Sequence, residues 1–456
     1  MLRADFLASN AAPLLTPHVS SSPTPTSFAD QGIRPLTIAY LASSGEAGGA
    51  ERVILEMVSV LKATEPAWSL HVVTVAPGPL SARAAELGAT VWVRPLPRAI
   101  ARFGETAVVT GGGSGRAAGS RSRVMAYAAA AGRLGASLWP AARYARELRA
   151  LLRTTGTDVV HSNGIKMHLL AAWARPRGTT LVWHLHDYLR QRPLTTALLR
   201  RSAARVNTVI ANSESVASEG RDLLGIPSGV PSVAAILNTV DLMHFAPAGS
   251  ALDLDVASGL PPAPTGVIRV GLVATFARWK GHETFLRALA EVARVPSNPP
   301  VRGYIVGGPV YQTEGSQFSL EELRALAGEL GIGDRVGFTG FVGDTAPALR
   351  ALDIVVHAST RPEPFGLVIA EAMACGRPVI VSDAGGAREI VNPGVDAVCA
   401  RPGDASGLAR AIEALASNPR RRAELGAQAR KSAERRFSRE RLATQLRGVY
   451  RGGVQK

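Results

Sequence analysis

Short runs of apolar residues alternate along this chain with longer segments whose apolar positions recur every three to four residues. The runs predict buried strands and the amphipathic segments predict helices. The first group of predicted strands covers residues 36–42, 71–75, 158–161, 181–184 and 208–211. The second group covers residues 267–273, 302–306, 335–338, 354–357 and 378–381. Strands separated by helical segments predict an α/β protein with parallel sheets.

The two groups of strands predict two doubly wound, Rossmann-like domains, which a chain of 456 residues is long enough to form. The first domain is predicted at 35–245 and the second at 265–435, joined by a Pro-, Ala-, Gly- and Asp-rich linker at 246–264. Residues 1–34 predict a disordered leader, and a glycine-rich insertion at about 103–137 predicts a flexible flap. Ligands of such domains bind at the carboxyl ends of the strands.

The composition narrows the class of protein. Apolar residues make up 46% of the chain, which is ample for burial. Only Cys375 and Cys399 occur, so no disulfide framework is expected and a reducing cytoplasm fits best. No apolar run reaches the ~20 residues that a membrane-spanning helix needs, and the first residues do not resemble a signal peptide. We therefore expect a cytoplasmic protein.

The net charge of +15 raises the question of an anionic partner. No nucleic-acid-reading motif accompanies the charge, so we expect no nucleic acid; an anionic membrane surface or acidic acceptor suits it better. Within 140–153, arginines at three- and four-residue steps predict one basic helix face, opposite Tyr144 and Leu148. Such a helix could lie on the inner face of the membrane. Two alternatives stay open: a sheet-covering helix with a solvated basic face, and an arginine-rich genome composition.

Two glutamates eight residues apart, Glu363 and Glu371, bracket a Pro-Phe-Gly turn that predicts the start of a helix ending at Gly376. The first N–H groups of this helix lack intrahelical acceptors and point toward any anion at that end. These groups belong to Gly366, Leu367 and Val368. Carboxylates beside a phosphate site commonly accept hydrogen bonds from sugar hydroxyls. The segment therefore predicts a nucleotide-sugar site.

This segment resembles the Glu-x7-Glu segment of the retaining GT-B glycosyltransferases of family 4, also called group 1 glycosyltransferases. The similarity covers roughly residues 35–450. It implies two Rossmann-like domains facing across a cleft, with a helix in 436–456 that packs back on the first domain. It also implies that Glu371 holds the ribose hydroxyls, that Glu363 contacts the transferred sugar, and that the amides after Phe365 hold the sugar and diphosphate.

Further donor-binding residues are implied by the second domain. Lys280, in an Arg278-Trp-Lys-Gly run, resembles the lysine that neutralises the diphosphate in this family. The family's Gly-Arg pair is replaced by Ala274-Thr275, so its customary phosphate arginine is absent. We expect Arg278 to supply that charge; the alternative is a solvated surface arginine. Phe341 lies in a segment similar to the one whose backbone reads the nucleobase edge.

The first domain is expected to receive the acceptor. Gly49 and Glu51 lie in a Gly-Gly-Ala-Glu loop, which in this family covers the diphosphate and the acceptor side. His186 follows an apolar strand and resembles the histidine that borders the reacting sugar. The alternative is a structural strand-end histidine, and His184 points the same way by two-residue alternation. Further acceptor-side candidates also lie at strand ends: His161, Asn163 and Asp187.

The expected function is the transfer of a hexosyl-type sugar from a nucleoside diphosphate to the hydroxyl of a glycan or lipid-linked acceptor, with retention, in cell-surface polysaccharide or glycolipid synthesis. The catalytic residues implied are His186, Glu363 and Lys280. We expect no metal and no cofactor besides the nucleotide-sugar co-substrate, because helix-start amides and a lysine can stabilise a leaving diphosphate. Two alternatives are a nucleotide-sugar epimerase on the same fold and a non-catalytic relative acting as a binding subunit.

Overall fold

The computed structural model describes residues 34–46, 48–101, 138–226, 232–294, 299–309 and 315–454. The insertion predicted at 103–137 and all but the last residue of the predicted leader lie outside the described residues. Leu36–Lys456 form one compact unit that contains two parallel sheets.

The first sheet is seven-stranded and all its neighbouring strands run parallel. Its strands, in spatial order, are β3 (Thr90–Val93), β2 (Ser69–Thr74), β1 (Thr37–Leu41), β4 (Val159–Asn163), β5 (Thr180–Leu185), β6 (Thr208–Ala211) and β7 (Ser232–Ala235). The order reverses between β1 and β4, which is the switch point of a doubly wound fold.

The second sheet is six-stranded and also parallel. Its strands, in spatial order, are β10 (Val336–Gly340), β9 (Val301–Val306), β8 (Ile268–Val273), β11 (Ile354–His357), β12 (Val379–Ser382) and β13 (Val398–Ala400). The order again reverses, between β8 and β11. The predicted α/β architecture with two Rossmann-like domains is confirmed.

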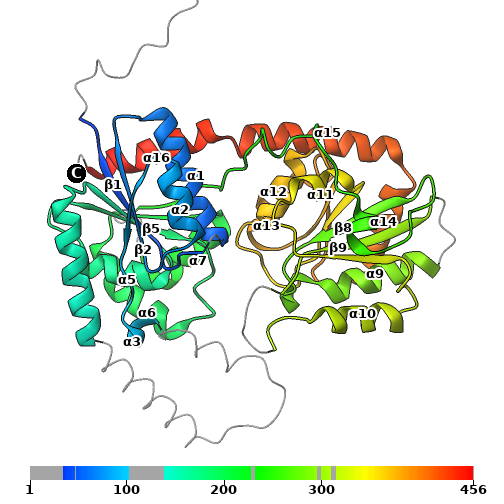
Figure 1. The fold of residues 1–456 in the computed structure, drawn as a ribbon, viewed down its shortest axis with the longest axis horizontal. Helices are drawn as coiled ribbons and strands as arrows, with labels where there is room; N and C mark the ends of the chain where they lie inside the picture. Colours follow the sequence, from blue (N-terminus) through cyan, green and yellow to red (C-terminus); the bar gives the residue numbers. More distant parts are fainter. Residues whose placement is uncertain are drawn as a thin grey trace, which may run out of the picture. The chain divides into compact units, whose positions relative to one another are not determined.

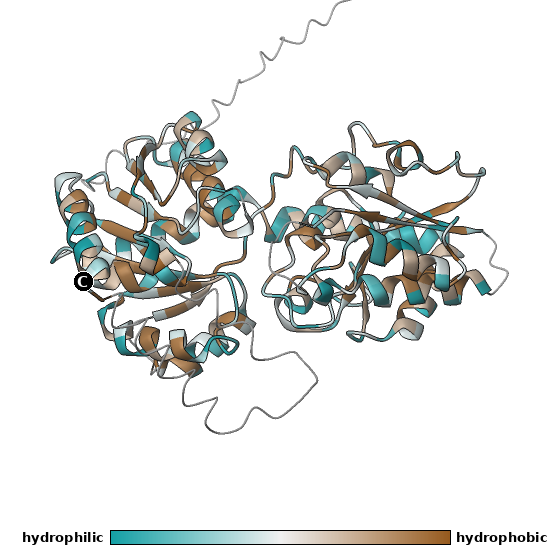
Figure 2. Cartoon of the chain, turned by 60° about the horizontal axis from the view of Figure 1, so that its bottom comes forward, coloured by the Kyte–Doolittle hydropathy of each residue, from teal (hydrophilic) through white to brown (hydrophobic). Residues whose placement is uncertain are grey.

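Helices cover the sheets, and Figure 2 shows apolar residues concentrated on the strands and the inner helix faces. Those of the first domain are α1 (Gly49–Thr64), α2 (Pro79–Glu86), α3 (Arg98–Ala101), a helix over 138–154, α5 (Ile165–Ala174), α6 (Pro193–Ser202) and α7 (Glu214–Leu224). The helices after the first domain, in chain order, are α8 (Leu254–Ser258), α9 (His282–Arg294), α10 (Leu320–Glu329), α11 (Ala346–Ala351), α12 (Leu367–Ala374), α13 (Gly385–Glu389), α14 (Ala405–Ala416), α15 (Pro419–Arg436) and α16 (Arg439–Val454). Two short 3-10 turns are η3 (Ala203–Arg205) and η4 (Arg278–Lys280).

Three strands were not predicted: β3, β7 and β13. All three are edge strands of three or four residues, and their side chains are mostly only half-buried. An edge strand has one neighbour instead of two and needs a shorter apolar run, so its sequence signal is weak.

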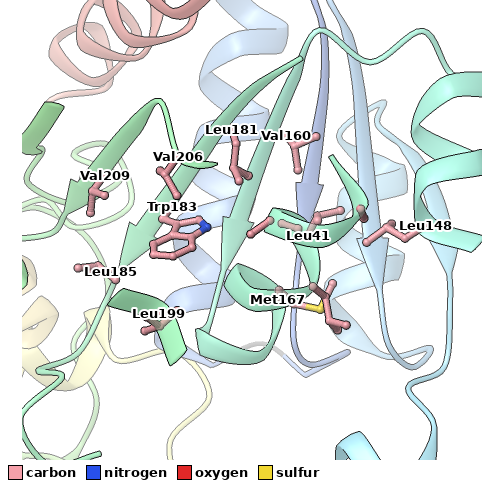
Figure 3. Packing of buried hydrophobic residues seen from close by; sticks show 14 of the residues in the cluster. Leu41, Leu148, Val160, Met167, Leu181, Trp183, Leu185, Leu199, Val206 and Val209 are labelled. Atoms are coloured by element: carbon pink, nitrogen blue, oxygen red, sulfur yellow. The ribbon is translucent and has the colours of Figure 1, made fainter. Parts of the chain in front are cut away.

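The apolar face of helix 138–154 packs in the core of the first domain. Tyr144, Leu148, Leu151 and Leu152 are at most 8% exposed, and Figure 3 shows Leu148 pointing into the same core as Leu41 and Met167. The structure thus agrees with the alternative of a sheet-covering helix, because its apolar face packs in the core. Attraction of its exposed arginines to an anionic surface stays a prediction.

The last helix, α16, returns to the first domain, and in Figure 1 it lies beside α1. Leu442, Ala443, Leu446 and Tyr450 are buried there among residues of α1 and β1. The same four positions recur with a helical spacing, so they form one apolar stripe. Packing of this stripe ties the end of the chain to the start of the first sheet.

The predicted linker at 246–264 contains α8, which packs on the second domain. Leu254 is 2% exposed in that core. Asp255 bonds to the Tyr304 hydroxyl at 2.5 Å and to Arg302 at 2.7 Å, both on β9. Burial opposes ionisation of Asp255, but the hydrogen bonds from Tyr304 and its other partners lower its pKa to about 2. Asp253 thus serves as the N-cap of α8, and Asp255 serves as a buried counter-ion.

Candidate active site

A cavity of about 360 Å³ opens at the carboxyl ends of strands of both sheets, where doubly wound folds bind ligands. Its first-domain wall consists of residues that follow β1, β5, β6 and β7: Gly49, Ala50, Arg52, His186, Asn212 and Asn238. Its second-domain wall consists of Val273, Ala274, Thr275, Lys280, Val306, Gly307, Gly308, Phe341, Val342, Thr345, Glu363, Pro364, Phe365, Gly366, Leu367, Val368 and Glu371. A smaller cavity of about 200 Å³ lies at the opposite, amino ends of β9 and β10.

All predicted donor-binding residues except Arg278 line the larger cavity. Sequence reasoning gave no role to several lining residues: Ala50, Arg52, Asn212, Asn238, Gly307, Gly308 and Thr345. Asn212, Gly307 and Gly308 come directly after strand ends, so the rule that ligands gather there could have found these three.

The start of α12 forms one side of the cavity. Gly366 is its N-cap with φ of +93°, a conformation that glycine adopts readily. A Cβ atom at this position would also lie 2.7 Å from Ile369 Cδ1. The glycine therefore lets the chain turn sharply into the helix, so that Gly366, Leu367 and Val368 face the cavity. Unsatisfied N–H groups and the helix dipole make such a helix start attractive to phosphate.

Glu363 is held by three neighbouring side chains in a nearly buried position. Lys280 Nζ lies 2.6 Å and 2.8 Å from its two carboxylate oxygens. His357 Nε2 and Ser359 Oγ lie 3.1 Å and 2.9 Å from Glu363 Oε2. Burial would raise the pKa of Glu363, but Lys280 and then His357 outweigh it and hold the pKa well below its usual value. The carboxylate is thus charged and fixed in one orientation.

Lys280 reaches this site because its backbone approaches the end of β11 closely. A Cβ atom at Gly281, whose φ is +81°, would lie only 1.8 Å from the Ala358 carbonyl oxygen. Only glycine permits this approach without backbone movement. The Lys280 side chain is 19% exposed and lies over the Trp279 ring as well as beside Glu363.

Glu371 is the second carboxylate in the cavity, and its environment differs. It is 9% exposed, and among the residues that the structure describes its carboxylate accepts one hydrogen bond, from Thr345 at 3.4 Å. Burial raises the pKa of Glu371, and the nearest opposing influence is the positive charge of Arg52. A buried carboxylate with so little hydrogen bonding is suited to accept bonds from a ligand's hydroxyl groups.

His186 lies on the first-domain wall, and its orientation is fixed by Asn163. The ring Nε2 lies 2.7 Å from Asn163 Oδ1. Because that oxygen can only accept, Nε2 carries the hydrogen, which leaves Nδ1 as the acceptor of the ring. Burial lowers the pKa of His186 to about 4, so the ring is neutral near pH 7. Asn163 therefore positions His186 and does not itself line the cavity.

A chain of buried polar groups runs from the neighbourhood of His186 to α16. The rings of His186 and His184 are 4.0 Å apart, and His184 Nδ1 lies 3.2 Å from His161 Nε2. His161 Nδ1 lies 2.7 Å from the Tyr450 hydroxyl, which lies 3.1 Å from the Tyr40 hydroxyl. Burial, followed by the neighbouring histidines, lowers the pKa of His161 and His184, so both are neutral. His161 is thus engaged on both ring nitrogens within the core and does not line the cavity.

We expect Tyr450→Phe to destabilise the protein by about 1–3 kcal/mol, because it leaves a buried nitrogen of His161 without a partner. Tyr40→Phe is the matched control, since the Tyr40 hydroxyl is the last group of the chain and His161 keeps its bond to Tyr450. Urea denaturation of both variants measures the difference. Equal losses in the two variants would contradict this account of the chain.

Arg278, expected to bind the diphosphate, points away from the cavity. Its guanidinium donates to Glu322 at 2.7 Å and to the Gly315 carbonyl at 3.2 Å, and lies 4.3 Å from the Phe318 ring centre. The expectation is therefore wrong, and the surface alternative describes Arg278 better. The reason is local: η4 turns Lys280 inward, so a side chain two residues earlier projects outward.

Two residues expected on the acceptor side do not line the cavity. Glu51 folds back over the start of its own helix, where its Oε2 would lie 2.8 Å from a Cβ atom at Gly48. Asp187 accepts a bond from the backbone N–H of Tyr188 and faces Arg192 at 3.5 Å. Neither side chain is free to point at the donor in this conformation.

Glu389 joins the two domains beside the cavity. Its carboxylate accepts the backbone N–H groups of Glu214 at 2.7 Å and Ser215 at 2.6 Å, at the start of α7. An acidic group at this position accepts hydrogen bonds from the first N–H groups of the helix, which have no acceptor within the helix itself. Glu389 thus caps a first-domain helix from the second domain.

The described part of the chain holds neither a cluster of metal ligands nor a membrane-spanning helix. No group of three or more His, Cys, Asp and Glu side chains there is arranged to hold a metal ion. None of the helices in that part combines the length and apolar character needed to cross a bilayer.

Known protein families match both domains. The family described as glycosyl transferases group 1 matches residues 261–432, and glycosyltransferase family 4 matches residues 47–243. The D-inositol 3-phosphate glycosyltransferase of Rhodococcus erythropolis is 34% identical over 252 residues, 54% of this chain and 54% of that protein. The chain thus matches about half the length of that relative.

One further relative and one solved structure match larger parts of the chain. The lipopolysaccharide core biosynthesis mannosyltransferase LpcC of Rhizobium leguminosarum is 32% identical over 305 residues, which cover 62% of this chain and 81% of LpcC. The crystal structure of Anabaena HepE in complex with UDP and glucose is similar over 91% of this chain and 99% of HepE, with a TM-score of 0.67 and 25% identity. On these matches and its two Rossmann-like domains, the chain belongs to the group 1 glycosyltransferases of family 4.

Proposed function

We propose that this glycosyltransferase moves a hexosyl-type sugar from a nucleoside diphosphate to an acceptor hydroxyl, with retention of anomeric configuration and without a metal ion. The observation that carries the proposal is Glu371, a buried carboxylate with one long hydrogen bond that faces a cavity beside the start of α12. A ribose offers the hydroxyl donors that Glu371 lacks, and the helix start suits the diphosphate beside it.

In this proposal the second domain holds the donor. Amides of Gly366, Leu367 and Val368, together with Lys280, stabilise the negative charge that develops on the leaving diphosphate. Glu363 is oriented to accept a hydrogen bond from a sugar hydroxyl, because Lys280, His357 and Ser359 fix its carboxylate. No role as a covalent nucleophile is assigned to either glutamate. The acceptor attacks the face that the diphosphate leaves, and the departing phosphate takes its proton.

The first domain is proposed to hold the acceptor. His186 is neutral and its Nδ1 is the acceptor atom of the ring, so it can receive a hydrogen bond from a hydroxyl of the sugar or of the acceptor. The similarity to LpcC supports a glycan or lipid-linked acceptor in cell-surface polysaccharide or glycolipid synthesis. The reaction is placed in the cytoplasm, where exposed arginines of helix 138–154 would attract an anionic membrane surface.

Calorimetric titration tests the donor site. We expect saturable binding of one nucleoside diphosphate among UDP, GDP and ADP, unchanged by a chelator, and slow hydrolysis of the matching nucleotide sugar when no acceptor is present. UDP is the first ligand to test because HepE was crystallised with it.

The other outcomes decide between the alternatives. No binding to any nucleotide would favour a non-catalytic subunit, and binding without hydrolysis or transfer would do the same. Conversion of the sugar without release of nucleotide would indicate an epimerase. Loss of binding with chelator would overturn the metal-free account of the leaving group.

A further inference from the structure

The positively charged side chains that line the cavity differ in whether they are paired with a carboxylate. Among its lining residues in the described ranges, Arg52 and Lys280 are the ones that carry a full positive charge. Lys280 is already paired with Glu363 through two hydrogen bonds. The guanidinium of Arg52 makes no hydrogen bond or ion pair with any residue in the part of the chain that the structure describes. Arg52 is also exposed to solvent. Arg52 is thus the unpaired cation of the cavity.

The position of Arg52 is unfavourable unless an anion is nearby. It is the fourth residue of α1, so its charge lies close to the positive end of the helix dipole. Gly49 and Ala50, at the same helix start, also line the cavity. Across the cavity, Arg52 is close enough to Glu371 to be the largest influence that favours the charged form of that carboxylate. The side chain therefore faces the same space as the donor-binding wall.

The second-domain wall has a position where a second positive charge is expected and a neutral residue lies. Thr275, a neutral residue, lines the cavity where the resemblance would place an arginine, and Arg278 is engaged with Glu322 and Phe318 outside it. A diphosphate brings at least two negative charges into the site, while Lys280 supplies one positive charge that Glu363 already shares. A further cation would balance the remaining charge, and Arg52 is the cavity side chain positioned to provide it.

We propose that Arg52 binds the diphosphate of the donor from the first-domain wall, opposite Lys280. This inference rests on the proposed function. It means that the diphosphate bridges the two domains, since Arg52 belongs to the first and Lys280 to the second. A nucleoside without phosphates would contact the second domain through Glu371 and make no direct contact with Arg52.

The test compares ligands that differ only in their phosphates. Arg52→Gln is titrated with the nucleoside diphosphate that the wild type binds best among UDP, GDP and ADP, and with the matching nucleoside. We expect the variant to lose roughly 10-fold or more in affinity for the diphosphate and less than about 2-fold for the nucleoside, because charge-assisted hydrogen bonds are the stronger class. The diphosphate's affinity should also depend less steeply on salt in the variant.

Two further variants keep the result interpretable. Arg278→Gln removes an arginine of the same site region that lies outside the cavity, so its affinities should match the wild type. Arg52→Lys keeps the charge but loses the planar, forked donors and should fall between wild type and Arg52→Gln.

The outcomes separate the two levels of the proposal. If the wild type binds a diphosphate and Arg52→Gln binds it equally well, the role of Arg52 is refuted while the proposed function stands. Equal losses for diphosphate and nucleoside would also refute it, since they indicate a structural effect. If the wild type binds no nucleoside diphosphate, the proposed function fails and this inference fails with it.

Discussion

Glu363→Gln is expected to destabilise the protein by about 3 kcal/mol, because removal of one partner leaves the other charge of a buried pair uncompensated. Lys280 would remain 19% exposed and without its carboxylate. His357 and Ser359 would keep a hydrogen-bonding oxygen at the amide, so the loss comes mainly from charge. Sugar transfer should fall roughly 100-fold, since hydrogen bonds to charged groups are worth about 1.5–3 kcal/mol.

A double-mutant cycle isolates the ion pair. Adding Lys280→Met to Glu363→Gln should restore most of the lost stability, because the unpaired charge is then gone. Glu86→Gln is a matched control that breaks the exposed Arg83–Glu86 pair, whose side chains are each 61% exposed, and it should have almost no effect. If the double variant is as unstable as the single one, the buried pair is not the source of the loss.

The pH dependence of stability gives an independent check of Glu363. Its folded-state pKa lies below the unfolded value, so its contribution is present above a pH of about 4.3 and is lost as the pH falls through the folded-state pKa. The free energy of unfolding of Glu363→Gln should therefore fall less than that of the wild type on acidification. Urea denaturation at several pH values between neutral and acidic measures this slope.

Glu371→Gln is expected to act in the opposite direction on stability while weakening donor binding. Burial raises the folded-state pKa of Glu371, so ionisation destabilises the unliganded protein as the pH rises from about 4.3 through that pKa. The neutral amide removes this cost, and the variant should be more stable than the wild type at pH 7 and similar to it at acidic pH. Thermal melting across that pH range tests the expectation.

The same substitution should weaken binding of the preferred nucleoside diphosphate roughly 10- to 100-fold, because an amide is a poorer acceptor for two neighbouring hydroxyls than a carboxylate. Thr345→Val, which removes only the 3.4 Å bond to Glu371, is the control and should change affinity much less. A variant that is more stable and still binds with wild-type affinity would contradict the ribose role of Glu371.

Much of the wall of the larger cavity could be predicted from the sequence because its parts are local. Glu363, Gly366 and Glu371 lie on one strand-end loop and one helix, so their spacing alone places them around a single helix start. Lys280 also follows a strand end, and parallel strands bring such ends to one edge. The sequence signal failed where the side-chain direction depends on a single turn, as in η4, which sends Arg278 outward.

The α/β class, the two groups of strands and the proposed donor segment could all be predicted from the sequence, since periodicity and turn residues act over short distances. Which side chains meet depends on the tertiary fold. Lys280 and Glu363 are 83 residues apart, Glu389 and Glu214 are 175, and His161 and Tyr450 are 289. Such pairs depend on how whole helices and domains pack, and a local pattern carries no information about that packing. For the same reason, a role for Arg52 could not be predicted from the sequence. Its position opposite Glu371 exists only once both domains have folded and packed together.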